Sequence, residues 1–319
     1  MISRQEARAQ RRGRPENWFL RMGSYWRDGI LFKRIHLRYY FIVNNLRRVR
    51  WDAKKRRGQA SFIYTIQRGV RIRMYLQNDL CRAIYVKDFE RKERAFHNAF
   101  LRPGDVYIDI GASFGLFTLI AARRVGLYGR VYAIEPVNEP FQQLEENVLL
   151  NRFINVTAHQ VACSDRRGEA LMYVTPDEYD GHHSMAKPAV ESATQQRVLV
   201  TTLDDFFDTH GLAGRVTMIK LDVEGWESYV LAGGRSVLSA PDAPLIQVEF
   251  TRGNRDAAGV TSQDLYQELL ALGYQIFDYD PGTRRLIPTT AEYADHPYLN
   301  LFAIKDPAAV TARLKRKKK

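Results

Sequence analysis

The sequence predicts an α/β fold with a doubly wound, mostly parallel sheet, and three observations support this prediction. Short apolar runs rich in β-branched residues alternate with segments of helical periodicity, which is the pattern of strand–helix–strand units. One strand-to-helix junction is rich in glycine, and acidic side chains directly follow several of the apolar runs. Because the carboxyl ends of parallel strands meet at one edge of such a sheet, we expect a ligand site there.

The 319 residues are enough for one sizeable core and an extension. We expect a basic, aromatic-containing N-terminal extension over 1–60, a main domain over 61–305 and a basic C-terminal tail over 306–319. Within the main domain, a lead-in covers 61–104 and the core covers 105–305.

Two elements are predicted in the lead-in. Alternating apolar residues indicate a β-hairpin within 61–85 that turns at Arg68-Gly69. Residues 89–100 have helical periodicity, and the Pro103-Gly104 pair that follows predicts the end of a helix. We expect no chemistry in either element.

The core begins with a strand over Val106–Ile110, a glycine-containing turn and a helix over Leu116–Arg124. Backbone N–H groups and a helix N-terminus at the end of a strand suit a nucleotide-like ligand. Gly111 would let the backbone approach that ligand closely, and Gly115 would let the helix pack on the strand.

This turn differs from the dinucleotide fingerprint, because Ser113 stands where G-x-G-x-x-G needs its second glycine. Asp109 would repel a phosphate, yet it could accept a hydrogen bond from an ammonium group. Both features favour a cofactor with an amino-acid end and no phosphate, such as S-adenosylmethionine. The alternative is an ordinary turn of an α/β sheet.

A second strand over Arg130–Ile134 ends in Glu135-Pro136. An acidic side chain at the tip of the second strand, about 20 residues past the glycines, is where a ribose diol is held. A solvated carboxylate is the alternative for Glu135. A helix over Glu139–Leu150 follows.

The alternation of strands and helices continues to the end of the core. The expected elements are a third strand over Val156–Val161, an inserted strand pair at Leu171–Val174 and Val198–Thr201, a fourth strand over Val216–Leu221, a fifth over Leu245–Phe250, a helix over Gln263–Leu272, and final strands at Tyr274–Phe277 and Leu299–Ile304 joined through the Asp280-Pro281-Gly282 turn.

A charged cluster stands at the end of the fourth strand. Lys220, Asp222 and Glu224 alternate, so in an extended segment they project to one side. Charged groups crowded at a cleft edge mark a functional site more often than not, and an ion-pair cluster that caps the strand is the alternative. Glu249 could join the two carboxylates around a divalent cation, although the spacing requires none.

Three motifs of this chain resemble the FkbM family of S-adenosylmethionine-dependent methyltransferases. They are D-I-G-A-S-F-G-x-x-T from Asp109, A-I-E-P-x-x-E-x-F-x-x-L-x-x-N from Ala133, and I-K-L-D-V-E-G-W-E-x-x-V-L-x-G-G from Ile219. The resemblance covers about 85–304. It implies a class I methyltransferase-like, Rossmann-like sheet of seven strands and O-methylation of a small-molecule or glycan hydroxyl, such as that of a sugar or a polyketide. Ser113 departs from the family, which usually carries Asn there.

The resemblance also implies roles for single residues. The methionine end of the cofactor would lie against the first turn, the ribose at the second strand and the adenine at Asp165, which is also an ordinary turn residue. The expected cofactor-binding residues are Asp109, Gly111, Ala112, Ser113, Gly115, Glu135, Pro136 and Asp165.

Methylation of a hydroxyl needs a base that accepts its proton. Asp222 and Glu224 are the first candidates, because they follow a strand that ends at the ligand edge. His182 and His183 are the rivals, in a loop that would face the acceptor in the family. Adjacent histidines without a third placed ligand are weak evidence for zinc, so no metal is assigned.

The net charge of +12 is concentrated near both ends of the sequence. Such ends are usually solvated, but they could also steer the protein to an anionic membrane face, a nucleic acid or an acidic glycan. The aromatic residues among the N-terminal basic ones fit a peripheral membrane helix or, equally, a cover packed on the domain. Cys81 and Cys163 lack metal or redox spacing, so we expect a reducing, cytoplasmic location, with contact to the inner membrane face as an option.

The same charge raises the alternative of an RNA methyltransferase or a basic nucleic-acid-binding module. The chain lacks the N/D-P-P-Y/F strand tip that accompanies methylation of base amino groups in related enzymes. Asp222-Val223-Glu224 would also repel phosphates. We therefore expect no specific nucleic-acid partner.

Overall fold

The computed structural model describes residues 30–86, 89–174, 194–251, 259–294 and 298–315. The chain divides into two compact units, Met1–Val49 and Arg50–Lys319. The second unit begins earlier than the expected boundary at residue 61. The reason is Trp51, which lies in helix α3 (Ile30–Arg56) and is buried, with its ring 5.8 Å from that of Phe62 and 5.6 Å from that of Tyr85.

The centre of the second unit is an eight-stranded sheet of order β12-β11-β13-β10-β9-β3-β4-β5. The five strands from β10 to β5 are parallel, whereas β13 runs antiparallel to both of its neighbours. The strands are β3 (Val106–Ile110), β4 (Arg130–Ile134), β5 (Val156–His159), β9 (Met218–Leu221), β10 (Leu245–Thr251), β11 (Gln275–Asp280), β12 (Arg285–Pro288) and β13 (Tyr298–Ile304).

The predicted doubly wound, mostly parallel sheet is confirmed, and its strand count differs by one. The Asp280-Pro281-Gly282 turn leads from β11 into β12, which pairs antiparallel with β11 at the sheet edge, rather than directly into the last strand. The inserted strand pair is also present, in a separate sheet made of β6 (Ala162–Cys163), β7 (Gly168–Val174) and β8 (Thr194–Thr201).

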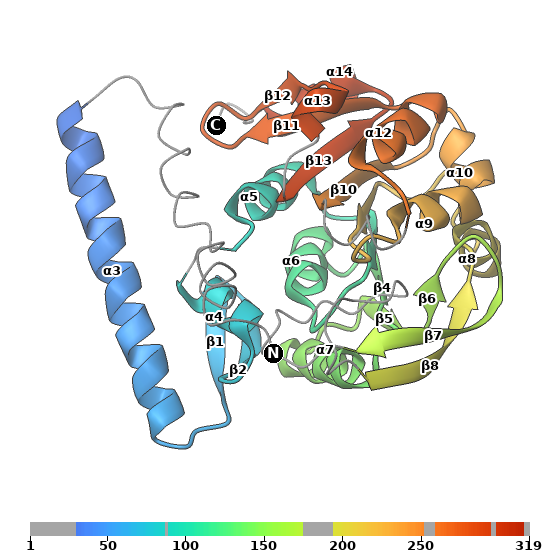
Figure 1. Cartoon of the computed structure of the whole chain (residues 1–319). Helices are drawn as coiled ribbons and strands as arrows, with labels where there is room; N and C mark the ends of the chain where they lie inside the picture. The colour runs from blue at the N-terminus through green and yellow to red at the C-terminus, as the bar shows by residue number, and fades with distance from the viewer. Residues whose placement is uncertain (1–29, 87–88, 175–193, 252–258, 295–297, 316–319) are drawn as a thin grey trace, which may run out of the picture. The chain divides into compact units, whose positions relative to one another are not determined.

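Helices cover both faces of the central sheet (Figure 1). Alternate side chains of β3 serve the two cores: Ile108 and Ile110 pack on one face, and Tyr107 packs on the other. The first face is covered by α8 (Leu203–His210), α9 (Glu227–Gly233), α10 (Arg235–Ser239) and α12 (Ser262–Ala271), and the second by α5 (Arg91–Phe100), α6 (Leu116–Val125), α7 (Asn138–Asn151) and α14 (Pro307–Leu314).

The predicted hairpin is present as β1 (Ser61–Gln67) and β2 (Val70–Tyr75), and α4 (Asp79–Val86), which was not predicted, follows it. The segment predicted as a basic C-terminal tail begins instead with α14, which Asp306 caps. Val310 and Leu314 on this helix are buried against the second core, so apolar contacts order the segment despite its charge. A short helix, α13 (Ala291–Ala294), precedes β13. No helix of the described residues is long and apolar enough to cross a membrane.

The structure requires glycine at position 111 for a reason that differs from the expected one. Its φ is +79°, and a Cβ atom there would lie 1.7 Å from the backbone oxygen of Asp222. The close neighbour is therefore the segment that follows β9, not only the space in front of the turn. Any side chain at position 111 has to push the ends of β3 and β9 apart.

We predict that Gly111→Ala lowers the free energy of unfolding by at least ~3 kcal/mol, because the clash is with backbone and the left-handed conformation adds strain. Gly104→Ala is the matched control: φ there is +92°, and nothing lies within 4 Å of the added Cβ. The control should lose only the conformational term of about 1–2 kcal/mol. Equal losses in urea denaturation would contradict the close-approach explanation.

Candidate active site

A cavity of about 370 Å³ lies at the carboxyl ends of β3, β4, β9 and β10, the edge at which a ligand site was expected. Its volume is in the range of small-molecule sites. The wall is formed by Asp79, Leu80, Ala83, Phe89, Ile110, Gly111, Ser113, Ile134, Glu135, Pro136, Val161, Ala162, Cys163, Met172, Asp222, Val223, Glu224, Trp226 and Glu249.

Four of the predicted cofactor residues, Gly111, Ser113, Glu135 and Pro136, line this cavity. The Glu135 carboxylate joins the two strand ends: it accepts hydrogen bonds from the backbone N–H of Ser113 at 2.8 Å and of Val137 at 2.9 Å. Ser113 has a φ of +48°, which is strained for a residue with a Cβ. The structure thus assigns the serine a backbone role in orienting Glu135.

Burial raises the pKa of Glu135 to about 7, and the two N–H donors only partly oppose this effect. Near neutral pH, the side chain is therefore poised between its neutral and ionised forms. A ligand that donates hydrogen bonds to the carboxylate favours ionisation.

Three other predicted cofactor residues lie behind the cavity wall. Gly115 makes room for a helix rather than a strand, because a Cβ there would lie 2.7 Å from Cδ1 of Leu144 in α7. Ala112 is buried in the same small cluster. Asp109 is buried beneath the turn and accepts a hydrogen bond from Thr118 Oγ1 at 2.5 Å.

Asp109 nevertheless suits a cationic ligand group. Burial raises its pKa to about 6, against the opposing effect of Lys220 and Thr118. Its second oxygen, Oδ1, is buried and has no hydrogen-bond partner among the described residues. An ammonium donor that reaches past Gly111 would satisfy this atom.

Asp165 does not contribute to the cavity wall, since its side chain is exposed and accepts a hydrogen bond from Ser164 Oγ at 3.0 Å. Ala162 and Cys163, which precede it in the chain, line the cavity instead. Ser164 holds the indole of Trp226, whose Nε1 donates to Ser164 Oγ at 3.0 Å. His182 and His183 lie outside the described residues.

The charged cluster after β9 is present and faces the cavity. Asp222 and Glu224 line it together with Glu249, and each of the three offers a carboxylate oxygen within 4.8 Å of the others. Glu224 adopts a φ of +55° in the turn, and Glu227 holds that turn by accepting from the N–H groups of Val223 at 3.1 Å and Gly225 at 3.3 Å. Three carboxylates at this separation can accept protons or bind a divalent cation.

Lys220 is the cation beneath these carboxylates. It is 4% exposed, and its Nζ lies 2.5 Å from Asp222 Oδ2. Burial by itself would lower the pKa of Lys220, but Asp222, Glu90 and Asp109 outweigh this effect and hold the pKa above its usual value. The side chain is therefore a permanent buried positive charge.

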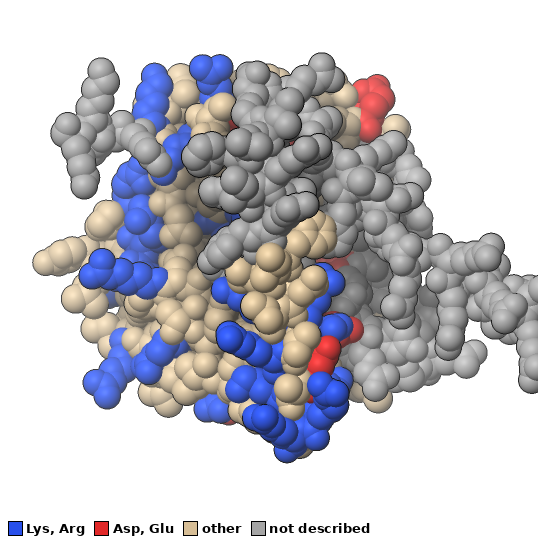
Figure 2. Space-filling view, turned by 90° about the vertical axis from the view of Figure 1, so that its left-hand side faces the viewer, with Lys and Arg blue, Asp and Glu red and all other residues tan. Residues whose placement is uncertain are grey.

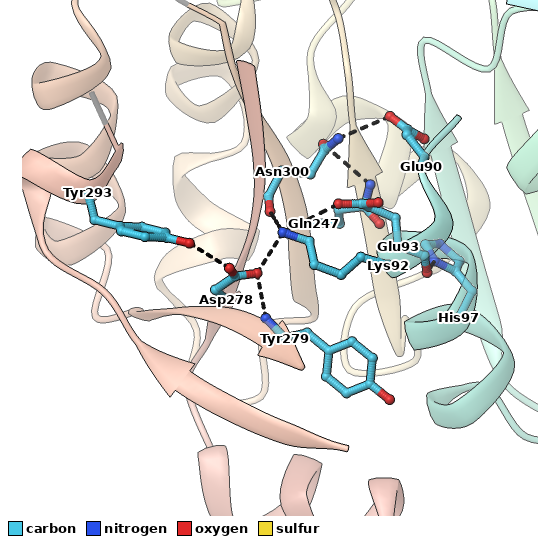
Figure 3. A network of polar contacts seen from close by, with 9 residues as sticks. All are labelled: Glu90, Lys92, Glu93, His97, Gln247, Asp278, Tyr279, Tyr293 and Asn300. Atoms are coloured by element: carbon cyan, nitrogen blue, oxygen red, sulfur yellow. Dashed lines mark hydrogen bonds and ion pairs between the residues drawn. The ribbon is translucent and has the colours of Figure 1, made fainter. Parts of the chain in front are cut away.

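Polar side chains of the neighbouring strands lie level with Lys220 and form a polar row across the sheet. Lys220 pairs with Asp109 of β3 on one side and with Gln247 of β10 on the other. Figure 3 shows the next part of the row, where Asn300 of β13 donates from Nδ2 to Glu90 Oε1 at 3.0 Å. The same close-up shows Lys92 of α5 bound to Asp278 Oδ1 at 2.6 Å.

Several wall residues were missed from the sequence. Asp79, Leu80 and Ala83 of α4, together with Phe89, line the cavity although no chemistry was expected in the lead-in. An isolated helix preceding the core carries no motif that places it over the strand ends. Glu249 had been named only as an optional cation ligand, and its position beside Asp222 follows from the parallel pairing of β9 and β10.

We predict that Lys220→Met lowers the free energy of unfolding by on the order of 3–5 kcal/mol at neutral pH, because it leaves buried carboxylates without their cation. Asp109 binds its proton more tightly in the folded state, with a pKa of about 6 against an ordinary value of 3.8. Lys220 lowers this pKa, so its loss should raise the pKa of Asp109 above about 6, and the deficit of the variant should shrink as pH falls from neutrality toward about 6.

The double variant Lys220→Met/Asp222→Asn should recover part of this loss, since it also removes one uncompensated charge. Urea denaturation at neutral pH and at about pH 6 measures the free energy of unfolding of each variant. A deficit that is independent of pH and unchanged in the double variant would mean that packing, not charge, is the role of Lys220.

Comparison with known proteins identifies relatives of the central part of the chain. Residues 109–276 match the family described as Methyltransferase FkbM domain. The 31-O-demethyl-FK506 methyltransferase FkbM of Streptomyces tacrolimicus is 30% identical, with a similarity that covers 43% of this chain and 62% of that protein. Methyltransferase 1 of Beauveria bassiana is 29% identical, over 41% of this chain and 59% of that protein.

Among solved structures, methyltransferase FkbM from Methylobacillus flagellatus KT is 18% identical, with a TM-score of 0.41 over 70% of this chain and 54% of that one. The chain spans about three fifths of the length of the curated relatives it matches. The family match itself takes in more than half of the chain and includes the turn after β3, the tip of β4 and the segment after β9. The chain therefore belongs to the FkbM methyltransferase family.

Proposed function

We propose that this chain transfers a methyl group from S-adenosylmethionine to a hydroxyl of a small-molecule or glycan acceptor. Membership of the FkbM family supports methyl transfer. The observation that carries the assignment of the site is Glu135, a carboxylate that two backbone N–H groups hold in the cavity wall at the tip of β4. A ribose diol donates hydrogen bonds to a carboxylate at this place in the fold.

The cofactor would lie along the edge from β3 to β6. Its amino-acid end suits the turn at Gly111, with Asp109 Oδ1 as an acceptor for the ammonium group. The apolar wall formed by Val161, Ala162 and Met172 suits the adenine ring, so Asp165 is not needed for this contact. When bound, the cofactor supplies a methyl group on a sulfonium for displacement by the acceptor oxygen.

The acceptor would occupy the remaining part of the cavity, between α4 and the segment after β9. Phe89 and Trp226 offer apolar surface there, and Asp79, Glu224 and Glu249 offer hydrogen-bond acceptors. Alignment of the two reacting groups in the cavity supplies much of the acceleration of such a transfer. Polar hydroxyl-bearing compounds fit a wall that combines flat apolar side chains with carboxylates.

A base has to take the proton of the acceptor hydroxyl. Glu224 is the first candidate, because it lies in a strained turn at the cavity wall. Asp222 is the second candidate, with one oxygen in the ion pair with Lys220. A wall with several carboxylates disfavours the phosphate backbone of a nucleic acid, which weighs against the RNA methyltransferase alternative.

Glu135→Ala should weaken binding of S-adenosylhomocysteine by about 1.5–3 kcal/mol, the scale of hydrogen bonds to a charged group. In the unsubstituted protein the affinity should rise as pH increases through about 7, because ionisation of Glu135 makes the acceptor that the ribose needs. Calorimetry over this pH range tests both statements, with Glu139→Ala, an exposed carboxylate of α7, as the control. Binding that is equally tight in both variants would remove the ribose assignment.

Glu224→Gln should lower turnover at least ~100-fold while affinity for S-adenosylhomocysteine is retained, and Asp222→Asn should behave similarly. His182→Ala and His183→Ala should cost less. Release of S-adenosylhomocysteine from a panel of sugars and polyketide alcohols is the assay. If the histidine variants are inactive while Glu224→Gln and Asp222→Asn turn over normally, the base is a histidine of the loop. If a chelator stops turnover and Mg²⁺ restores it, the carboxylates bind a cation instead.

A further inference from the structure

Helix α3 exposes an apolar stripe along one of its faces. Ile42, Leu46 and Val49 follow the spacing i, i+4, i+7 that places side chains on one face of a helix. They are 59%, 52% and 59% exposed. Asn44 and Trp51, which are seven residues apart and lie on the other side of the helix, are buried. Aliphatic side chains gathered in one exposed row are unusual on a surface that meets only water.

Basic side chains border this stripe. Residues 41–57 contain seven Lys and Arg residues and one acidic residue, Asp52. Arg50 lies one turn after Leu46 and is exposed, and Arg56 lies two turns after Val49 and continues the stripe. Figure 2, which turns the left-hand side of Figure 1 toward the viewer, shows mostly Lys and Arg among the charged side chains of that face.

We propose that α3 is a docking surface for an anionic lipid bilayer, on which it lies in the plane of the interface. Ile42, Leu46 and Val49 would enter the boundary between headgroups and acyl chains. The arginines would reach outward to lipid phosphates while their methylene stems stay at the apolar level. This inference is independent of the chemistry proposed for the cavity, because none of these residues lines it.

The apolar stripe decides between a bilayer and other anionic partners. A nucleic acid or an acidic polymer would be bound by the arginines alone and would leave the three aliphatic side chains in water. A bilayer satisfies both the charge and the apolar surface. Binding to it should therefore require Ile42, Leu46 and Val49 as well as the basic residues.

The test uses the full chain and sedimentation with two kinds of vesicle, phosphatidylcholine alone and phosphatidylcholine mixed with phosphatidylglycerol. We expect binding to the anionic vesicles only, and Leu46→Asp should lower the partition coefficient at least ~10-fold. Leu127→Asp is the matched control, because Leu127 is 70% exposed and lies outside α3. The control should bind as the unsubstituted protein does.

A second pair of variants separates charge from apolar contact. Arg50→Glu/Arg56→Glu should lower binding at least ~10-fold and weaken its salt dependence. Arg215→Glu, at an exposed arginine outside α3, should leave both unchanged. Failure of the unsubstituted protein to bind anionic vesicles at low salt would overturn the proposal. So would binding that survives Leu46→Asp, or RNA binding without vesicle binding. Loss of a dimer in Leu46→Asp, seen by light scattering without vesicle binding, would assign the stripe to a second copy.

Discussion

The buried ammonium group of Lys220 is the interaction on which the carboxyl edge of the sheet depends. Three acidic side chains from three places in the chain hold its pKa above the usual value: Asp222 after β9, with which it is ion-paired, Glu90 before α5 and Asp109 of β3. Carboxylates this deeply buried are costly unless a cation compensates them. The lysine thereby allows one edge of an otherwise apolar sheet to carry the carboxylates that line the cavity.

Close backbone packing makes the second contribution to the cavity. The segment after β9 passes so near the turn after β3 that only glycine fits at position 111. On either side of this contact, Ser113 and Glu224 have positive φ values and both line the cavity. Strained residues persist where the surroundings hold them, and here the hydrogen bonds to Glu135 and Glu227 do so. The wall is consequently held by strands and turns of the sheet.

The two proposed halves of the site differ in how they are built. The cofactor half consists of turns that directly follow β3 and β4, and these turns bond to each other through Glu135. The acceptor half combines the segment after β9 with α4 and Phe89, which reach the strand ends from earlier in the chain. Specificity for an acceptor can therefore change in α4 without disturbing the cofactor contacts. Such a division fits the general rule that one fold can host different functions through changes in the elements around its site.

The sequence by itself determined the alternation of strands and helices, because it depends on local periodicity. It also determined the residues that follow each strand, which meet at one edge because the strands are parallel. Gly111, Glu135, Asp222 and Glu224 were found in this way, and all four line the cavity. Only the tertiary structure decided that Asp109 is buried behind the turn and that Asp165 faces solvent. It also decided that Glu249 joins the carboxylates and that α4 closes the cavity. Glu249 reaches the other carboxylates because β10 pairs with β9, and Asp109 lies beside Lys220 because β3 pairs with β9. Both pairings join distant parts of the chain, and no local pattern of residues encodes them.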